Sequence, residues 1–201
     1  MKKFAAFLTA SALTAALTVS AAAADLSYTV VPGDTMWKLA VKYQVGTSEI
    51  ISANPQVANP NLIYPGQVLN IPQISDAVID YESEVIRLVN EIREENGLKA
   101  LPANWELSRV ARYKSEEMSS ARYFSHTSPT YGTPFQMMRS FGLSYRTAGE
   151  NIAYGQRTPA AVVDAWMNSS GHRANILSAS YTQIGVGYCA SGNYWTQMFI
   201  G

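Results

Sequence analysis

Residues 28–72 most restrict how this chain can fold, because their turn signals and apolar spacing describe a complete small unit. Pro32 and Gly33 indicate a turn, and Asp34 or Thr35 then provides a helix N-cap. The expected elements are a strand over 28–31, a helix over 36–43, a second helix over 47–54 and a closing strand over 67–71. The order strand, helix, helix, strand predicts a first domain over residues 28–72.

The rest of the chain predicts a larger second domain over residues 82–201, after a linker at 73–81. Its expected elements are helices over 82–96 and 106–121, a third helix that starts at Thr158-Pro159 and ends before Gly171, and strands over 183–188 and 194–200 joined by a turn at 191–193. Helices around a small antiparallel sheet predict the α+β class. Because the linker is poor in glycine and proline, the two domains are expected to lie close together.

The first 24 residues have the features of a secretory signal peptide. Lys2 and Lys3 form a positive region, residues 4–19 form an apolar stretch, and Ala22 to Ala24 provide the small residues of a cleavage site. No other segment approaches the roughly 18 apolar residues of a membrane span, so no transmembrane segment is expected in the mature chain. The sequence therefore predicts a secreted protein that begins at Asp25.

Charge and cysteine content exclude several function classes. Removal of Lys2 and Lys3 lowers the basic residues from 15 to 13, against 15 acidic residues, so the mature chain is slightly negative. Such a chain does not attract nucleic acid or an anionic membrane electrostatically. Cys189 has no second cysteine to pair with, so the hydrophobic core must supply the stability, and its apolar surroundings predict a buried, inert thiol.

Both histidines follow a small residue in a polar segment. His126 comes after Ser125, His172 comes after Gly171, and Glu150 lies between them in a predicted third turn. Imidazole changes charge near neutral pH and is the commonest metal ligand. If the three side chains converge, they can hold a divalent ion or perform acid–base chemistry. The alternative is that each histidine is an ordinary surface or capping residue.

Residues 28–72 resemble the LysM family in the segments YTVVPGDTMWKLAVKY, IISANPQ and NPNLIYPGQVLNIP. The resemblance implies a βααβ fold with both helices on one face of the sheet. It also implies binding of N-acetylglucosamine-containing glycans, which in a bacterial wall means peptidoglycan. The implied groove residues are Gly33, Asp34, Thr35, Met36, Asn61, Leu62 and Ile63. The alternative for Gly33 and Asp34 is that the turn requires them whether or not a sugar binds.

The chain from about residue 83 to 201 resembles the cysteine-poor bacterial branch of the CAP superfamily, which includes cysteine-rich secretory proteins. The matching segments are YFSHTSP, AGENIAYG, VVDAWMNSSGHRANIL, and YTQIGVGY with YWTQMF. The resemblance implies an α-β-α sandwich whose cleft contains two histidines and two acidic residues. His126, Glu150 and His172 match three of these four positions.

The fourth position of that cleft has no matching acid in this chain. Gln136 or Thr130 stands where bacterial relatives often carry an acidic residue. Glu117, on the helix before His126, is a candidate replacement. The alternative is that Glu116 and Glu117 form a solvated helix face and that the cleft has no fourth acid.

Two functions follow from these observations. The first is a secreted, cell-wall-associated protein that binds peptidoglycan through LysM and an ion or ligand through His126, Glu150 and His172. The second is a metal-dependent hydrolase acting on cell-envelope peptide or glycan. In it the same three residues are the catalytic candidates and hold Zn²⁺ with one coordination position open for water. The chain has no His-Glu-x-x-His or Gly-x-Ser-x-Gly signature. The sequence leaves open whether the second domain is an enzyme.

Overall fold

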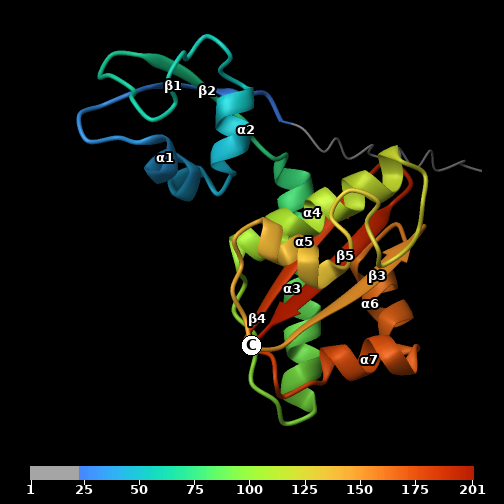
Figure 1. Ribbon diagram of the computed structural model, residues 1–201. Coiled ribbons are helices and arrows are strands. Elements are labelled where there is room, and N and C mark those ends of the chain that lie inside the picture. Colours follow the sequence, from blue (N-terminus) through green and yellow to red (C-terminus); the bar gives the residue numbers. More distant parts are fainter. Residues whose placement is uncertain (1–22) are drawn as a thin grey trace, which may run out of the picture.

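The computed structural model describes residues 23–201, so the predicted signal peptide, apart from Ala23 and Ala24, lies outside the described residues. Two domains follow one another along the chain (Figure 1). The first has the order β1 (Leu26–Thr29), α1 (Met36–Tyr43), α2 (Thr47–Ser52) and β2 (Val68–Ile71). The two strands pair antiparallel, with Leu26 opposite Ile71 and Thr29 opposite Val68. The βααβ order is as predicted, although β1 starts two residues before the predicted strand.

The first domain is held together by a small apolar core and one buried amide. Leu39, Ile50 and Leu69 are almost completely buried where the helices pack on the sheet. The side-chain nitrogen of Asn54 donates to the carbonyl oxygens of Ile50 and Asn70, both at 2.7 Å, and its oxygen accepts from the Asn70 amide at 2.8 Å. Because a buried amide is costly unless it is hydrogen-bonded, these contacts fix α2 against β2.

The second domain is an α-β-α sandwich around a three-stranded antiparallel sheet. Its elements are α3 (Asp76–Glu95), α4 (Trp105–Ser120), α5 (Pro134–Ser140), β3 (Ala148–Tyr154), α6 (Pro159–Met167), α7 (Ser170–Ile176), β4 (Gln183–Cys189) and β5 (Tyr194–Ile200). The central strand is β5, between β3 and β4. Helices α3, α6 and α7 contribute to the core on one face of the sheet, and α4 and α5 to the core on the other (Figure 1).

Strand β5 is buried on both faces because successive side chains point to opposite sides of a sheet. Trp195 and Phe199 belong to the core with α3 and α6, whereas Met198 and Ile200 belong to the core with α4 and α5. On β4 the second face carries glycine instead. A Cβ on Gly187 would lie 2.1 Å from the carbonyl carbon of Ala111 in α4. This confirms that the glycines of the last strands allow helix and strand to pack closely.

The first helix of this domain starts earlier than predicted. Residues 76–81, predicted as linker, form the first turns of α3, so the connection from β2 is only residues 72–75. Val78 and Val85 are seven residues apart on the same helix face, and both are buried in the core. The helical pattern therefore begins before residue 82.

Two predicted turns are regular structure instead. The segment Gly149 to Asn151 lies in β3, because β5 supplies backbone partners along its whole length. The helix that starts at Pro159 ends at Met167, and α7 starts at Ser170, so Gly171 and His172 are helical. Gly171, which indicated a helix end, lies instead in the first turn of the next helix. Helix α5 was not predicted.

An ion pair joins the two domains. On α4, Arg109 donates from Nε to Glu49 Oε1 at 2.5 Å and from Nη2 to Glu49 Oε2 at 2.7 Å, while Nη2 is 3.1 Å from Ser48 Oγ. Both charged side chains are about four-fifths shielded from solvent. The domains lie close together, as the short linker predicted. No helix within residues 23–201 is long and apolar enough to cross a membrane.

Candidate functional site

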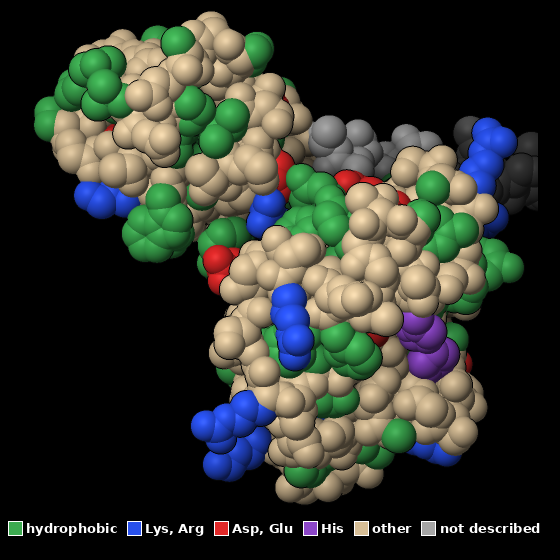
Figure 2. Space-filling model, in the orientation of Figure 1, with side chains coloured by type: hydrophobic (Ala, Val, Ile, Leu, Met, Phe, Trp, Pro, Cys, Tyr) green, Lys and Arg blue, Asp and Glu red, His purple; other side chains and the backbone are tan. Residues whose placement is uncertain are grey.

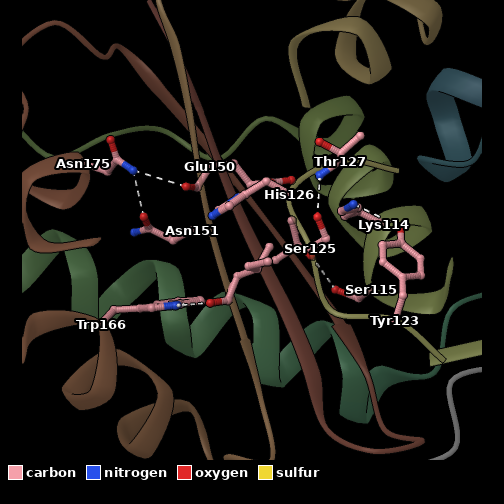
Figure 3. A network of polar contacts seen from close by, with 12 residues as sticks. Lys114, Ser115, Tyr123, Ser125, His126, Thr127, Glu150, Asn151, Trp166 and Asn175 are labelled. Carbon is pink, nitrogen blue, oxygen red and sulfur yellow. Dashed lines mark hydrogen bonds and ion pairs between the residues drawn. The ribbon is translucent and has the colours of Figure 1, made fainter. Parts of the chain in front are cut away.

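The three predicted site residues reach the same region from three different elements. His126 lies in the loop after α4, Glu150 on β3 and His172 on α7. His126 Nδ1 is 2.7 Å from Glu150 Oε1 (Figure 3). The imidazole of His126 is about half exposed, whereas the Glu150 side chain is only 2% exposed. The two histidines of the chain adjoin on one face of the second domain (Figure 2).

A chain of side-chain amides fixes Glu150 relative to His172. Asn175 Nδ2 donates to the Glu150 carbonyl at 3.2 Å and to Asn151 Oδ1 at 2.8 Å (Figure 3). Asn151 Nδ2 in turn donates to the His172 carbonyl at 3.1 Å and to Gln197 Oε1 at 2.9 Å. Because Asn151 and Gln197 are fully buried, these hydrogen bonds bind α7 rigidly to β3. No local sequence pattern indicates these amides, since the residues in contact are at least 21 positions apart.

The loop that carries His126 is held at both ends by Glu117. Tyr123 donates its hydroxyl to Glu117 Oε2 at 2.5 Å, and Ser128 Oγ donates to Glu117 Oε1 at 2.9 Å. The fully buried Lys114 donates to the Tyr123 oxygen at 3.0 Å (Figure 3). Burial acts to raise the pKa of Glu117, but hydrogen bonds from Tyr123 and Ser128 help to bring it below its ordinary value. Glu117 therefore positions the loop, and it is not a solvated helix residue.

Its neighbour on α4 is different. Glu116 is exposed, as expected for a residue on the solvated face of a helix. Of the two predicted roles, Glu116 has that of a solvated helix residue, whereas Glu117 contributes to the region of the site. Only Glu117 is connected to the candidate site, and the connection runs through the loop rather than through a contact with His126.

The two histidines differ in pKa because burial and neighbouring groups act on them differently. The hydrogen bond to Glu150 raises the pKa of His126, whereas burial and the charge of His126 lower the pKa of His172. Burial also raises the pKa of Glu150. Glu150 Oε2 is buried and has no hydrogen-bond partner within residues 23–201, so His126 is the main stabilising partner of this carboxylate.

We expect the two histidines to titrate separately, His126 above the ordinary value of about 6.5 and His172 below it. Because the folded pKa of His126 is raised, its contribution to stability is present below about pH 6.5 and is lost as the pH rises through the raised value. Glu150→Gln should lower the pKa of His126. NMR titration of the ring protons measures both values, and a His126 that titrates below His172 would contradict this arrangement.

The geometry of the described residues does not fit the expected zinc site. Within residues 23–201, no three His, Cys, Asp or Glu side chains are grouped so that they could hold a metal ion. One oxygen of Glu150 is engaged by His126, and the other is buried. The carboxylate therefore supports the imidazole instead of facing an open coordination position.

A second candidate site lies on the first domain. A groove of about 380 Å³ is lined by Asp34, Thr35, Met36, Trp37, Thr47, Ile51, Pro60, Asn61, Leu62 and Ile63. Six of the seven predicted glycan-binding residues line it, and Gly33 does not. Asp34 Oδ2 accepts hydrogen bonds from the Tyr28 hydroxyl at 2.8 Å and the Val31 amide at 2.9 Å, so Asp34 also holds the turn. Trp37 was not among the predicted groove residues; it is apolar yet lies outside the buried stripe of α1.

Two family models match the chain. A model of the cysteine-rich secretory protein (CAP) family matches residues 86–199, and a LysM domain model matches residues 28–72. The uncharacterized protein YkwD of Bacillus subtilis (strain 168) is 58% identical over 125 residues, which cover 62% of this chain and 49% of that protein. The secreted LysM effector ECP6 of Passalora fulva is 47% identical over 49 residues, which cover 24% of this chain and 21% of that protein.

A solved structure agrees with the larger match. The crystal structure of an extracellular protein containing an SCP domain, from Bacillus anthracis strain Ames, has a TM-score of 0.59 and 31% identity to this chain. The similarity covers 68% of this chain and 47% of that one. This chain thus spans about half the length of YkwD and of the Bacillus anthracis protein.

Proposed function

Because this chain belongs to the cysteine-rich secretory protein (CAP) family and carries a LysM domain, we propose that it is a secreted binding protein held on the bacterial cell wall. In this proposal the LysM domain binds the N-acetylglucosamine-containing glycan of peptidoglycan. The CAP domain presents His126 and His172 to a ligand.

The observation that carries this proposal is the groove on the LysM domain. Its wall combines exposed apolar side chains with small polar ones. Leu62 is about half exposed, and Trp37 is 66% exposed, although burial of either side chain would be favourable. Thr47 and Asn61 lie on the same wall. A sugar with hydroxyl and acetamide groups matches such a surface, since its polar groups find hydrogen-bond partners and its methyl group finds apolar contact.

We expect the protein to sediment with purified peptidoglycan, with a dissociation constant in the micromolar to millimolar range because one groove offers a small contact. The double substitution Asn61→Ala with Leu62→Ala should abolish sedimentation by removing two groove side chains. Tyr64→Ala is the matched control, because Tyr64 is 60% exposed in the same loop but does not line the groove. Equal sedimentation of the double variant and the control would contradict the proposal.

The proposed role of the CAP domain rests on the His126–Glu150 pair. When Nδ1 of His126 is engaged by Glu150, the exposed part of the ring leaves Nε2 available to a ligand. A nearby His172 offers a second imidazole with a different proton affinity. The hydrolase alternative would require His126, Glu150 and His172 to rearrange around a metal ion, because they are not grouped to hold one in this structure. Stoichiometric zinc that is retained by the purified protein and lost in His126→Ala would favour it.

A further inference from the structure

A cavity of about 540 Å³ lies between the LysM and CAP domains, and neither domain would form it alone. Its wall is formed on one side by α1 and the start of α2, and on the other by α4 and the segments around α5. Its lining includes Trp37, Thr47 and Ser48 from LysM, and Trp105, Glu106, Arg109, Tyr131, Ser140 and Phe141 from CAP. Figure 2 shows hydrophobic side chains gathered around this junction. The volume is in the range of ligand sites.

Trp37 connects this cavity to the groove of the LysM domain. Trp37 and Thr47 line both hollows, so the groove and the cavity share one wall. The fold does not need an indole at position 37, since the core face of α1 consists of Met36, Leu39 and Ala40. An exposed tryptophan between two hollows is placed to contact a ligand that extends through both.

The CAP side of the cavity is aromatic. The rings of Tyr131 and Phe141 have centroids 5.3 Å apart, and the guanidinium of Arg109 lies 5.0 Å from the centroid of Phe141. Trp105, at the first position of α4, is partly exposed in the same wall and belongs to neither core of the CAP domain. Aromatic faces of this kind can pack against the C–H groups of a sugar ring.

The electrostatics of the cavity favour an uncharged ligand. Arg109 is neutralised by the bidentate ion pair with Glu49, which leaves the exposed Glu106 as the charge on the lining and disfavours an anionic ligand. Thr47, Ser48 and Ser140 supply hydroxyl groups. The same ion pair holds the two walls at a fixed separation. A neutral sugar chain needs apolar faces and hydroxyl partners rather than a charge, and the cavity provides both.

We propose that the glycan strand bound in the LysM groove continues past Trp37 into the interdomain cavity, where Trp105 contacts its following sugars. This inference rests on the proposed function, since the strand is the N-acetylglucosamine-containing glycan assigned to the groove. The CAP domain then contributes to glycan binding, and the protein recognises a longer segment of the strand than its LysM domain covers.

The test compares an N-acetylglucosamine trimer with a hexamer, titrated into the full chain by calorimetry. We expect the hexamer to bind the wild-type protein more tightly than the trimer. A longer oligomer also gains affinity from having more binding registers, so the variant Trp105→Ala isolates the contribution of the cavity. In Trp105→Ala the hexamer should bind about three- to tenfold more weakly than to the wild type, with trimer affinity unchanged. Trp105→Phe, which keeps an aromatic ring, should restore part of the loss.

Tryptophan fluorescence provides a second readout. Trp166 and Trp195 are buried, so a change on binding reports mainly on Trp37 and Trp105. The trimer should perturb Trp37 alone, and the hexamer should perturb both. Phe135→Ala is the control, because Phe135 is an exposed CAP aromatic that does not line the cavity.

The failures of the two proposals are distinguishable. If the trimer and hexamer bind and Asn61→Ala with Leu62→Ala abolishes binding, but Trp105→Ala leaves hexamer affinity and fluorescence unchanged, the cavity proposal is overturned and the proposed function stands. If neither oligomer binds the wild-type chain, both are overturned. Thermal unfolding of Trp105→Ala at the wild-type temperature shows that a weaker hexamer affinity comes from the site rather than from the fold.

Discussion

Trp166→Ala is expected to lower the free energy of unfolding of the CAP domain by about 3–5 kcal/mol. Trp166 is 1% exposed on α6 and packs in the core between α6 and the sheet, with Val162 and Val163 beside it on the helix. Its indole Nε1 also donates to the Ile152 carbonyl of β3 at 3.4 Å. Alanine leaves a cavity that the strands and helices around it cannot fill by small movements. Urea unfolding followed by circular dichroism measures the loss.

Trp37→Ala is the matched control for this change. It removes the same indole from an exposed position, so the stability should change by no more than about 0.5 kcal/mol. The LysM domain should keep its own transition in Trp166→Ala, because its core shares no residue with the CAP cores. An unchanged CAP transition in Trp166→Ala would mean that the indole is not buried in solution.

Glu82→Ala is expected to lower the free energy of unfolding by a similar amount, about 3–5 kcal/mol, because it breaks a buried ion pair. Glu82 on α3 is 3% exposed and accepts hydrogen bonds from Arg112 Nε at 2.8 and 2.9 Å and from the Tyr188 amide at 3.0 Å. Burial raises its pKa to about 7 even though the charge of Arg112 opposes the shift. Removal of the carboxyl group leaves the guanidinium and the β4 amide without their partner in a largely buried place.

The neighbouring Glu84 provides the control for this prediction. It lies on the same helix and pairs with Arg87, but both side chains are about half exposed. Exposed ion pairs contribute little, so Glu84→Ala should lower the free energy of unfolding far less than Glu82→Ala. Chemical denaturation of both variants at the same pH gives the comparison. Equal losses for Glu82→Ala and Glu84→Ala would show that burial of the Glu82 pair does not govern its contribution.

Much of the local structure was predictable because its causes lie close together in the sequence. Thr35 accepts from the Lys38 amide at 3.1 Å, and Thr158 accepts from the Ala161 amide at 3.2 Å, so each helix start depends on a residue three positions away. The two closing strands were recognisable from their apolar and aromatic runs. Where local signals were misleading, as at Gly149 to Asn151, pairing with β5 overrode the turn preference.

The amino-acid sequence was enough to predict the two domains and the order of the LysM elements. Through the family resemblance it also grouped His126, Glu150 and His172. The burial of Glu150 behind His126 and the contact of Arg109 with Glu49 in the other domain became visible only in the folded structure. These contacts join residues 24 and 60 positions apart. Helical and strand periodicity specifies which face of an element is buried. It does not specify which distant element covers that face, because the choice of partner depends on how all the elements pack together.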